Sequence, residues 1–235
     1  MQLPEQMNIT EQVIDISNIT DEQSTYYHKL AEELEEKYTA LGQGRQIFTL
    51  SGPPGSGKSV ISAILGHLYS DNGSFNFANV GLDSFHFDND TLVEKGLLNV
   101  KGRYDTYDTD KLHSKLSLFK SGDDVLLPYY SRKNHNPIED YLEISNPNVL
   151  MLLEGQWLLR NTPSWKNLRE FYSFNLEVSG PVEVLAENVI DRHVRGGRNI
   201  DEAKRIYTEN DLVNTKEIAD NSVACDQKIL FYKDI

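Results

Sequence analysis

Residues 52–59 read Gly-Pro-Pro-Gly-Ser-Gly-Lys-Ser, which matches the phosphate-binding pattern G-x-x-x-x-G-K-[S/T]. The segment before it, residues 46–51, reads as a short buried strand. The segment after it, from Ser59, carries apolar residues at the three- and four-residue spacing of a helix face. Because this motif requires a strand, a glycine-rich loop and a helix in that order, we expect the loop to hold a nucleoside triphosphate.

The loop residues suit that task chemically. Glycines adopt backbone angles that other residues resist, and they bare successive N–H groups for the β- and γ-phosphates. Lys58 would place positive charge where negative charge spreads during transfer, and Ser59 would offer its hydroxyl to Mg²⁺. The alternative, a glycine turn with an incidental lysine, is disfavoured by the flanking strand and helix. The predicted triphosphate-binding residues are Gly52, Pro53, Pro54, Gly55, Ser56, Gly57, Lys58 and Ser59.

The rest of the chain alternates between strand-like and helix-like segments. This order indicates an α/β fold, the P-loop NTPase fold, with a parallel sheet of five or more strands and helices on both faces. Apolar residues from about 21 to 41 form the stripe of an N-terminal amphipathic helix. We expect residues 1–44 to be an acidic tail and a helix packed on the main P-loop domain of residues 45–235. Further strands are predicted at 80–83, 125–128, 149–154, 171–178 and 228–232, and helices at 109–121, 181–195, 201–209 and 211–219.

Composition narrows the function classes. A net charge of −13 over 235 residues argues against a general nucleic-acid binder, which needs a basic footprint. No apolar stretch approaches the roughly 20 residues that span a membrane. The start of the chain lacks a secretory signal, and the single cysteine, Cys225, cannot form an internal disulfide, so we expect a cytoplasmic protein. Residues 1–40 hold nine acids and two bases; this is a solvated helix face or a surface for a partner.

Two classes of nucleoside-triphosphate-binding protein, the GTPase switches and the motor or helicase ATPases, are disfavoured because the chain lacks their motifs. GTPase switches need an N-K-x-D and a D-x-x-G, and neither occurs. Motor and helicase ATPases usually end a hydrophobic strand in paired acids, whereas residues 149–153 end in the single acid Glu154. That carboxylate could hold Mg²⁺ through water, or it could be a solvated strand end.

Asp83 follows the second predicted strand, in Gly-Leu-Asp-Ser-Phe-His at residues 81–86. The carboxyl ends of parallel strands share one sheet edge, so Asp83 would lie near the phosphate loop. There it could accept a proton from an attacking hydroxyl while facing the metal, although a surface acid is an equal alternative.

Five blocks together resemble a known family. They are the loop, V-G-L-D-S-F-H-F-D (80–88), K-G-R-Y-D-T-Y-D-T-D-K-L (101–112), L-P-Y-Y-S-R (127–132) and L-M-L-L-E-G (150–155). Their order and spacing are similar to those of the phosphoribulokinase, uridine kinase and bacterial pantothenate kinase family, and in particular to its short branch that includes kinases associated with fructose transport. The resemblance spans about residues 46–225; the first 20 residues have no clear counterpart.

The resemblance implies roles for individual residues. The loop would bind ATP, Asp83 would match the catalytic aspartate, and Glu154 the magnesium-associated glutamate. Tyr107 and Asp108 would fall on the block that contacts the acceptor's hydroxyls, with Asp108 favoured; Tyr104 and Lys101 are weaker candidates on the same loop. Tyr129 and Arg132 match a block that closes the acceptor pocket, although Arg132 could pair with Asp108 instead. His86 matches a position close to the acceptor, and a local structural role is an alternative. Family members commonly dimerise, so a homodimer is conceivable.

Residues 191–198, Asp-Arg-His-Val-Arg-Gly-Gly-Arg, are the last functional stretch. Arg192 and Arg195 would share a helix face, and two glycines follow them. Relatives carry an arginine-bearing lid here, so the resemblance implies a lid at about 192–200 and a catalytic phosphate contact by Arg192 or Arg195. The alternative is a basic helix end favoured by the helix dipole.

We therefore expect a kinase that transfers the γ-phosphate of ATP, with Mg²⁺, to a hydroxyl of a small metabolite such as a sugar, a nucleoside or a pantothenate-like compound. The alternative is a nucleotide-dependent ATPase or switch that acts through a protein partner. The acceptor block around Asp108 and Arg132 separates the two, because a switch would not need it.

Overall fold

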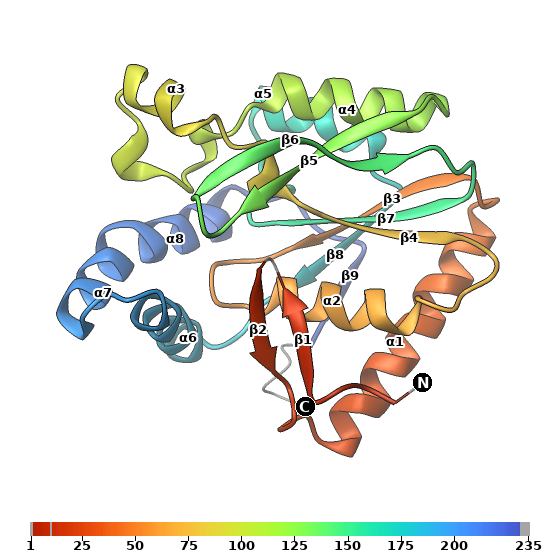
Figure 1. Ribbon diagram of the computed structural model, residues 1–235, viewed down its shortest axis with the longest axis horizontal. Coiled ribbons are helices and arrows are strands. Elements are labelled where there is room, and N and C mark those ends of the chain that lie inside the picture. Colours follow the sequence, from red (N-terminus) through yellow and green to blue (C-terminus); the bar gives the residue numbers. More distant parts are fainter. Residues whose placement is uncertain (1, 10, 231–235) are drawn as a thin grey trace.

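The computed structural model describes residues 2–9 and 11–230 of the chain. Within these residues, five parallel strands form the central sheet in the spatial order β4–β7–β3–β8–β9 (Figure 1). Because the strands run the same way, their carboxyl ends share one edge, where open α/β sheets bind ligands. The predicted α/β fold with a five-stranded parallel sheet is confirmed. The strands are β3 (Arg45–Ser51), β4 (Asn76–Gly81), β7 (Val149–Gly155), β8 (Phe174–Val178) and β9 (Gln227–Ile229).

Helices cover both faces of the sheet (Figure 1). The first layer is α1 (Asp21–Ala40) with α2 (Lys58–Leu68), and the second includes α4 (Thr109–Ser121) and α5 (Pro163–Leu168). A parallel sheet needs both layers because each of its strands is apolar on both sides.

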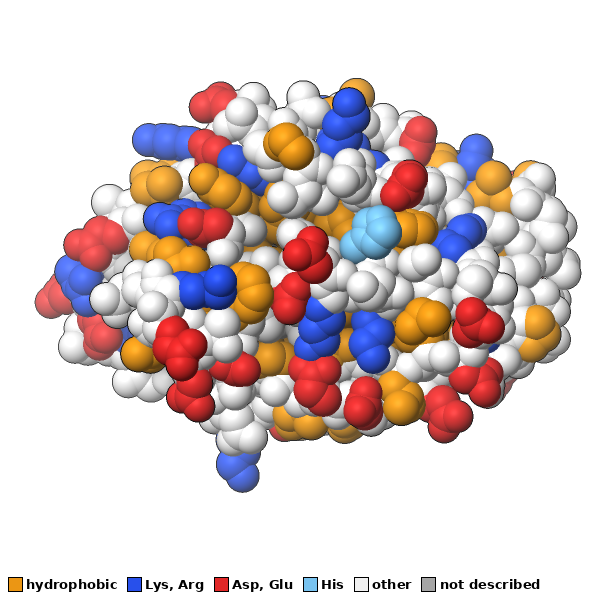
Figure 2. Space-filling view, turned by 90° about the horizontal axis from the view of Figure 1, so that it is seen from above, with side chains coloured by type: hydrophobic (Ala, Val, Ile, Leu, Met, Phe, Trp, Pro, Cys, Tyr) orange, Lys and Arg blue, Asp and Glu red, His pale blue; other side chains and the backbone are white. Residues whose placement is uncertain are grey.

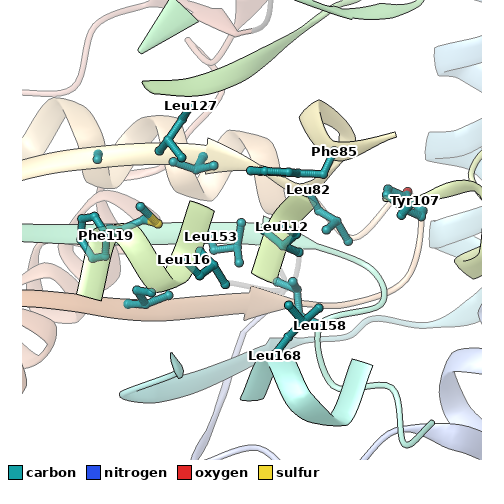
Figure 3. Close-up of a cluster of buried hydrophobic side chains, with 14 of the residues drawn as sticks. Leu82, Phe85, Tyr107, Leu112, Leu116, Phe119, Leu127, Leu153, Leu158 and Leu168 are labelled. Carbon is teal, nitrogen blue, oxygen red and sulfur yellow. The ribbon is translucent and has the colours of Figure 1, made fainter. Parts of the chain in front are cut away.

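Strand β7 illustrates this two-sided burial. Leu150 and Leu152 pack in the cluster under α1 and α2, while Met151 and Leu153 belong to the cluster under α4. Alternate side chains of a strand point to opposite faces, so one apolar run serves both cores. Figure 3 shows the second cluster, in which Leu112 of α4 lies near Leu153 of β7.

Helix α1 forms where the amphipathic stripe predicts it. Thr20 caps its first turn in a reciprocal capping box with Gln23. Its buried stripe includes Leu30 and Leu34, each 2% exposed, in the cluster shared with α2. The hydroxyl of Tyr38 donates to the carbonyl oxygen of Gly44 at 2.7 Å, which ties the end of the helix to the chain just before β3.

Two antiparallel hairpins lie outside the central sheet (Figure 1). The first pairs β1 (Gln6–Ile9) with β2 (Gln12–Asp15) and lies against α2. The second pairs β5 (Val125–Ser131) with β6 (Asn136–Ile144). The sequence pattern assigned no element to residues 1–20 or to β6.

The strand predicted at 125–128 is therefore wrong as a member of the parallel sheet. Its residues form β5, and the chain returns after only four residues to pair antiparallel in β6. A parallel neighbour would need a crossover of a dozen or more residues. Val125 and Leu127 of β5 instead belong to the second core cluster.

Smaller corrections concern the boundaries of elements. The strand predicted at 80–83 is β4, which ends at Gly81, so that Asp83 lies in the 3₁₀ turn η1 (Leu82–Phe85). The strand predicted at 171–178 begins at Phe174, because a 3₁₀ turn, η4 (Arg169–Phe171), precedes it. The strand predicted at 228–232 is β9, which ends at Ile229; residues 231 and 232 lie outside the described residues.

The helices predicted at 201–209 and 211–219 are one continuous run. It consists of α7 (Ile200–Ile206), a π-helical turn η5 (Tyr207–Asp211) and α8 (Leu212–Asn221). The π-helical turn lies where the sequence pattern indicated a break between two helices, so the helical run continues through that position. Before this run stands α6 (Val182–Arg195), close to the predicted 181–195. The remaining elements are α3 (Asn89–Glu94), η2 (Leu98–Val100) and η3 (Tyr104–Thr106).

Among the described residues, no helix combines the length and apolar character needed to cross a membrane. On the face shown in Figure 2, acidic and basic side chains of the described residues are interspersed, without a continuous basic band.

Candidate active site

Two adjoining cavities lie over the carboxyl edge of the sheet. The strand cavity, of about 310 Å³, is bounded by the ends of β4 and β7 and by the β5–β6 hairpin. The loop cavity, of about 180 Å³, is bounded by the phosphate loop and α6. Ser59 and Arg132 line both of them, so the two cavities meet at these side chains.

The phosphate loop is built so that only glycine fits at key positions. Gly55 has a φ of +81°, and a Cβ placed there would lie 2.5 Å from the carbonyl oxygen of Leu185 in α6. A Cβ on Gly52 would lie 2.2 Å from the carbonyl oxygen of Val178 in β8. The loop is therefore pressed between the sheet and α6, with its main chain open to the loop cavity.

The side chain of Lys58 folds back onto its own loop. Its ammonium donates to the carbonyl oxygens of Gly52 and Pro53 at 2.8 and 2.9 Å. Burial lowers the pKa of Lys58 to about 8, although the charges of Glu154 and Asp83 oppose the shift. An ammonium held this way is preorganised to contact an incoming phosphate.

Ser59 and Glu154 bring two oxygen-bearing side chains together at the meeting point of the cavities. The hydroxyl of Ser59 donates to Oε1 of Glu154 at 2.9 Å. Burial raises the pKa of Glu154, while the neighbouring charge of Lys58 counteracts it. Mg²⁺ prefers hard oxygen ligands and usually takes only one or two carboxylates from the protein, so this pair fits it.

Asp83 lies in η1 and lines the strand cavity, with 49% of its side chain exposed there. The hydroxyl of Tyr107 donates to its Oδ1 at 3.1 Å. Enclosure by the protein opposes ionisation of this carboxyl, but His86, Arg132 and the Tyr107 hydrogen bond outweigh it and lower the pKa of Asp83. The group is therefore held as a carboxylate, the form that accepts a proton.

His86 and Tyr107 lie beside the carboxylate of Asp83. Their rings stack with centroids 3.8 Å apart. Nδ1 of His86 lies 3.0 Å from the carbonyl oxygen of Thr106, and its Nε2 lies 3.7 Å from Asp83. Burial lowers the pKa of His86, so the ring is neutral near pH 7. Burial and the charge of Asp83 raise the pKa of Tyr107, which keeps its hydroxyl a donor.

The structure separates Asp108 from this group. Its carboxylate caps α4 by accepting a hydrogen bond from the backbone N–H of Lys111 at 2.9 Å. The neighbouring Tyr107 makes the contact with Asp83 instead. The predicted acceptor contact of Asp108 stays a prediction, and Asp108 is not among the residues that line either cavity.

Lys101 and Tyr104 hold the surrounding loops together. The ammonium of Lys101 donates to Asn89 and to the carbonyl oxygen of His135, each at 2.7 Å, which joins α3 to the β5–β6 turn. The guanidinium of Arg160 stacks 3.6 Å from the ring centre of Tyr104. Neither Lys101 nor Tyr104 lines the strand cavity, so their predicted contact with the acceptor also stays a prediction.

Tyr129 and Arg132, by contrast, line the strand cavity, while their predicted contact with the acceptor stays a prediction. Tyr129 lines the strand cavity and stacks on Tyr141 with ring centroids 4.6 Å apart. Arg132 follows β5 directly, and its positive charge favours the ionised forms of Asp83 and Glu154, although burial keeps the pKa of Glu154 raised. The alternative pairing of Arg132 with Asp108 stays a prediction.

Arg192 and Arg195 of α6 both line the loop cavity, opposite the phosphate loop. Asp211, in the π-turn η5, holds Arg192 at 3.2 Å and His193 at 3.0 Å. Gly197 follows α6 with a φ of +94°. The predicted lid at about 192–200 thus corresponds to the end of α6 and its turn into α7; its closure stays a prediction.

Two residues of this region were missed by sequence reasoning. Asn188 donates to the carbonyl oxygen of Gly55 at 2.9 Å and lines the loop cavity. Its signal was available, since positions 188, 192 and 195 share one helix face. Asp211 carried no such signal, because the π-turn that aims it at Arg192 cannot be read from spacing.

Comparisons with known proteins agree with this site. No family model matches the chain. The uncharacterized protein YggC of Escherichia coli K12 is 31% identical over 185 residues, which are 78% of this chain and 77% of that protein. A Schizosaccharomyces pombe protein provisionally named a uridine kinase is 28% identical over 194 residues, covering 78% of this chain and 82% of its own.

Among solved structures, a protein from Silicibacter sp. TM1040, provisionally described as a fructose transport system kinase, superposes with a TM-score of 0.79. It is 28% identical, and the match covers 86% of this chain and 98% of that one. From these relatives and the phosphate loop at the sheet edge, we conclude that the chain belongs to the phosphoribulokinase, uridine kinase and pantothenate kinase-like family of P-loop kinases and is a phosphotransferase that acts on hydroxyl acceptors.

Proposed function

We propose that this protein transfers the γ-phosphate of ATP to a hydroxyl group of a small metabolite bound in the strand cavity. The observation that carries the proposal is the position of Asp83. Its carboxylate lines the strand cavity and is close enough to Lys58, at the loop cavity, to affect the pKa of that lysine. A base placed between a cavity for an acceptor and a loop for phosphates suits phosphoryl transfer.

Asp83 is the proposed catalytic base. It would accept the proton of the acceptor hydroxyl as that oxygen attacks the γ-phosphorus. Tyr107 would hold the carboxylate in place through its 3.1 Å hydrogen bond. The lowered pKa of Asp83 keeps the carboxylate ready over the neutral pH range.

The triphosphate would bind in the loop cavity. The N–H groups of the loop and the N-terminus of α2 favour its β- and γ-phosphates. Lys58 would exchange its hydrogen bonds to Gly52 and Pro53 for phosphate oxygens. Arg192 and Arg195 would contact the transferring group from the opposite wall, and closure of α6 would exclude water.

Ser59 and Glu154 would hold Mg²⁺, directly or through water. When bound, the ion neutralises charge on the β- and γ-phosphates. The raised pKa of Glu154 in the free protein would fall when a cation binds beside it.

The strand cavity favours a compact polyhydroxy acceptor. Three tyrosines, Tyr129, Tyr130 and Tyr141, line it, and Arg132 offers a planar group of hydrogen-bond donors. Sugars and nucleosides pair apolar faces with hydroxyl edges, as such a wall requires. Because the Silicibacter relative is described as a fructose transport system kinase, we propose a sugar or a polyol as the acceptor.

The proposal can be tested by measuring ADP production from ATP and Mg²⁺ with a panel of D-fructose and other sugars, polyols, uridine, pantothenate and D-glycerate. One class should stimulate ADP production well above the acceptor-free rate. Asp83→Asn should reduce the stimulated rate by about 10²–10⁴-fold, with ATP affinity kept within about threefold. Glu177→Gln, outside both cavities, is a matched control that should change neither quantity.

Near-normal turnover by the Asp83→Asn variant would refute the role of Asp83. ATP consumption that no acceptor stimulates would favour a nucleotide-dependent switch acting through a protein partner.

A further inference from the structure

The β1–β2 hairpin lines part of both cavities. Asn8 lines the strand cavity, while Gln12 and Ile14 line the loop cavity. Ile9 is 8% exposed and lines both, at the place where the two cavities meet. In Figure 1 the hairpin lies beside the N-terminal end of α2, where the phosphate loop leads into that helix.

Glu11 fastens the tip of this hairpin to the end of β5. Its carboxylate accepts hydrogen bonds from the hydroxyl of Ser131 and from the backbone N–H of Lys133, both at 3.0 Å. The backbone N–H of Lys133 and the hydroxyl of Ser131 lower the pKa of Glu11, so the contact is made by the charged form. Hydrogen bonds to a carboxylate are shorter and stronger than those between neutral groups.

The contacts of Glu11 also fix the backbone beside Arg132. Ser131 and Lys133 stand on either side of Arg132, which lines both cavities. Glu11 therefore holds the backbone segment that carries Arg132. Glu11 also has a φ of +64°, a conformation that costs free energy for a residue other than glycine and that its hydrogen bonds must offset.

The root of the hairpin is fixed more firmly than its tip. Ile16 is 5% exposed in the core cluster under α1, and its backbone N–H donates to the carbonyl oxygen of Glu5 at 2.9 Å. The tip has Glu11 as its link to β5. A root packed in the core, with a tip linked to β5 through an ionised side chain, would allow the hairpin to move as a unit.

We propose that the β1–β2 hairpin is a cover of the active site: Glu11 latches it and positions Arg132, and Asn8 is a specificity-determining residue for the acceptor. The assignment of Asn8 rests on the proposed function, because it requires an acceptor in the strand cavity. The cover itself requires only that the loop cavity binds a nucleotide.

The chemistry of Asn8 suits a hydroxylated ligand. Its amide can donate and accept a hydrogen bond at once, and it faces a cavity with tyrosine walls. A site that hydrogen-bonds a hydroxyl rejects analogues that lack it, because its own polar groups are then left unpaired. Asn8 would therefore sort acceptors by their hydroxyl pattern.

The cover can be tested on the full chain with Glu11→Gln and Asn8→Ala. Glu5→Gln and Val13→Thr are matched controls, since Glu5 and Val13 line neither cavity and Val13 is 63% exposed. The first readout is the dissociation rate of a fluorescent mant-ATP in stopped flow. The second is the KM for the panel compound that is phosphorylated fastest. Melting temperatures check that the variants are folded.

Glu11→Gln should release mant-ATP about fivefold faster or more, because the latch loses its charged acceptor. Asn8→Ala should raise the KM for the acceptor about tenfold while the KM for ATP stays within about twofold. Both controls should behave as the wild type. An effect of Glu11→Gln on the melting temperature alone would assign Glu11 a merely structural role and overturn the latch.

The outcomes separate this proposal from the proposed function. Wild-type release of mant-ATP by Glu11→Gln would overturn the cover, whatever the acceptor is. An unchanged KM for the acceptor in Asn8→Ala would overturn the role of Asn8. A wild-type protein that phosphorylates no compound of the panel would overturn the proposed function and the assignment of Asn8 with it, while the mant-ATP measurement still decides the cover.

Discussion

The lowered pKa of Lys58 predicts that ATP binding weakens as the pH rises from 7 to 9. Removal of the ammonium from water by burial lowers this pKa from 10.5 to about 8. In the free protein Lys58 is then about nine-tenths protonated at pH 7 and about one-tenth at pH 9. If the phosphates require the ammonium, the apparent Kd rises about tenfold over this range. A lysine with an ordinary pKa would give an almost constant Kd.

The assay is a fluorescence titration with mant-ATP and Mg²⁺ at half-unit steps of pH from 7 to 9. The γ-phosphate is ionised over most of this range, so its own titration adds little. Lys58→Met, which has no charge to lose, should bind more weakly but with a constant Kd. A constant Kd in the wild type would refute the lowered pKa of Lys58. An equal rise in Lys58→Met would assign the pH dependence to another group.

Three further predictions concern the residues around the phosphate path. Tyr107→Phe removes the 3.1 Å hydrogen bond to Asp83, so turnover should fall about threefold to thirtyfold and the acidic limb of the rate profile should move to higher pH; an unmoved limb would contradict the role of this bond. Asp211→Asn frees Arg192 and His193, so kcat should fall at least about fivefold with the KM for the acceptor unchanged, and a wild-type kcat would count against the positioning of Arg192. Gly55→Ala places a methyl group 2.5 Å from a main-chain oxygen at a φ of +81°, so calorimetry should show a loss of about 1–3 kcal/mol of stability and no detectable ATP binding; a stable variant that binds ATP would disprove the tight packing of the loop.

The parts of the fold that were predicted depend on local pattern. The phosphate loop, its strand and its helix occupy adjacent residues, so a single stretch of sequence defines them. Helix α4 was predicted with its observed bounds because its cap at Asp108 and the glycine after Ser121 mark both ends. These features need no information about distant parts of the chain.

The two hairpins were missed for a physical reason. The apolar run at the start of β5 has the character of a buried parallel strand, and only its packing against the second core distinguishes it. The hairpin at the N-terminus alternates weakly, with exposed Val13 beside half-buried Ile14, because it faces cavities more than a core. Tertiary context decides the pairing of both segments.

The residues of the candidate site likewise divide into those that the sequence could place and those that it could not. Asp83 was expected near the phosphate loop because parallel strands end at one edge, whereas Arg132 follows a strand outside the parallel sheet and was placed by the resemblance to the family. The choice between Tyr107 and Asp108 could not be made from sequence, since both follow η3 and either could face the acceptor. The structure orients the tyrosine hydroxyl toward Asp83 and leaves the carboxylate of Asp108 to cap α4.

The central claim is that the γ-phosphate of ATP passes to a hydroxyl of a small metabolite. Phosphorus NMR of the purified protein with ATP, Mg²⁺ and each panel compound tests it most directly, because it distinguishes a phosphate ester from inorganic phosphate. We predict a new phosphomonoester signal with one sugar or polyol, in an amount equal to the ADP formed and absent with Asp83→Asn. ADP accompanied by inorganic phosphate alone in every mixture would contradict the claim.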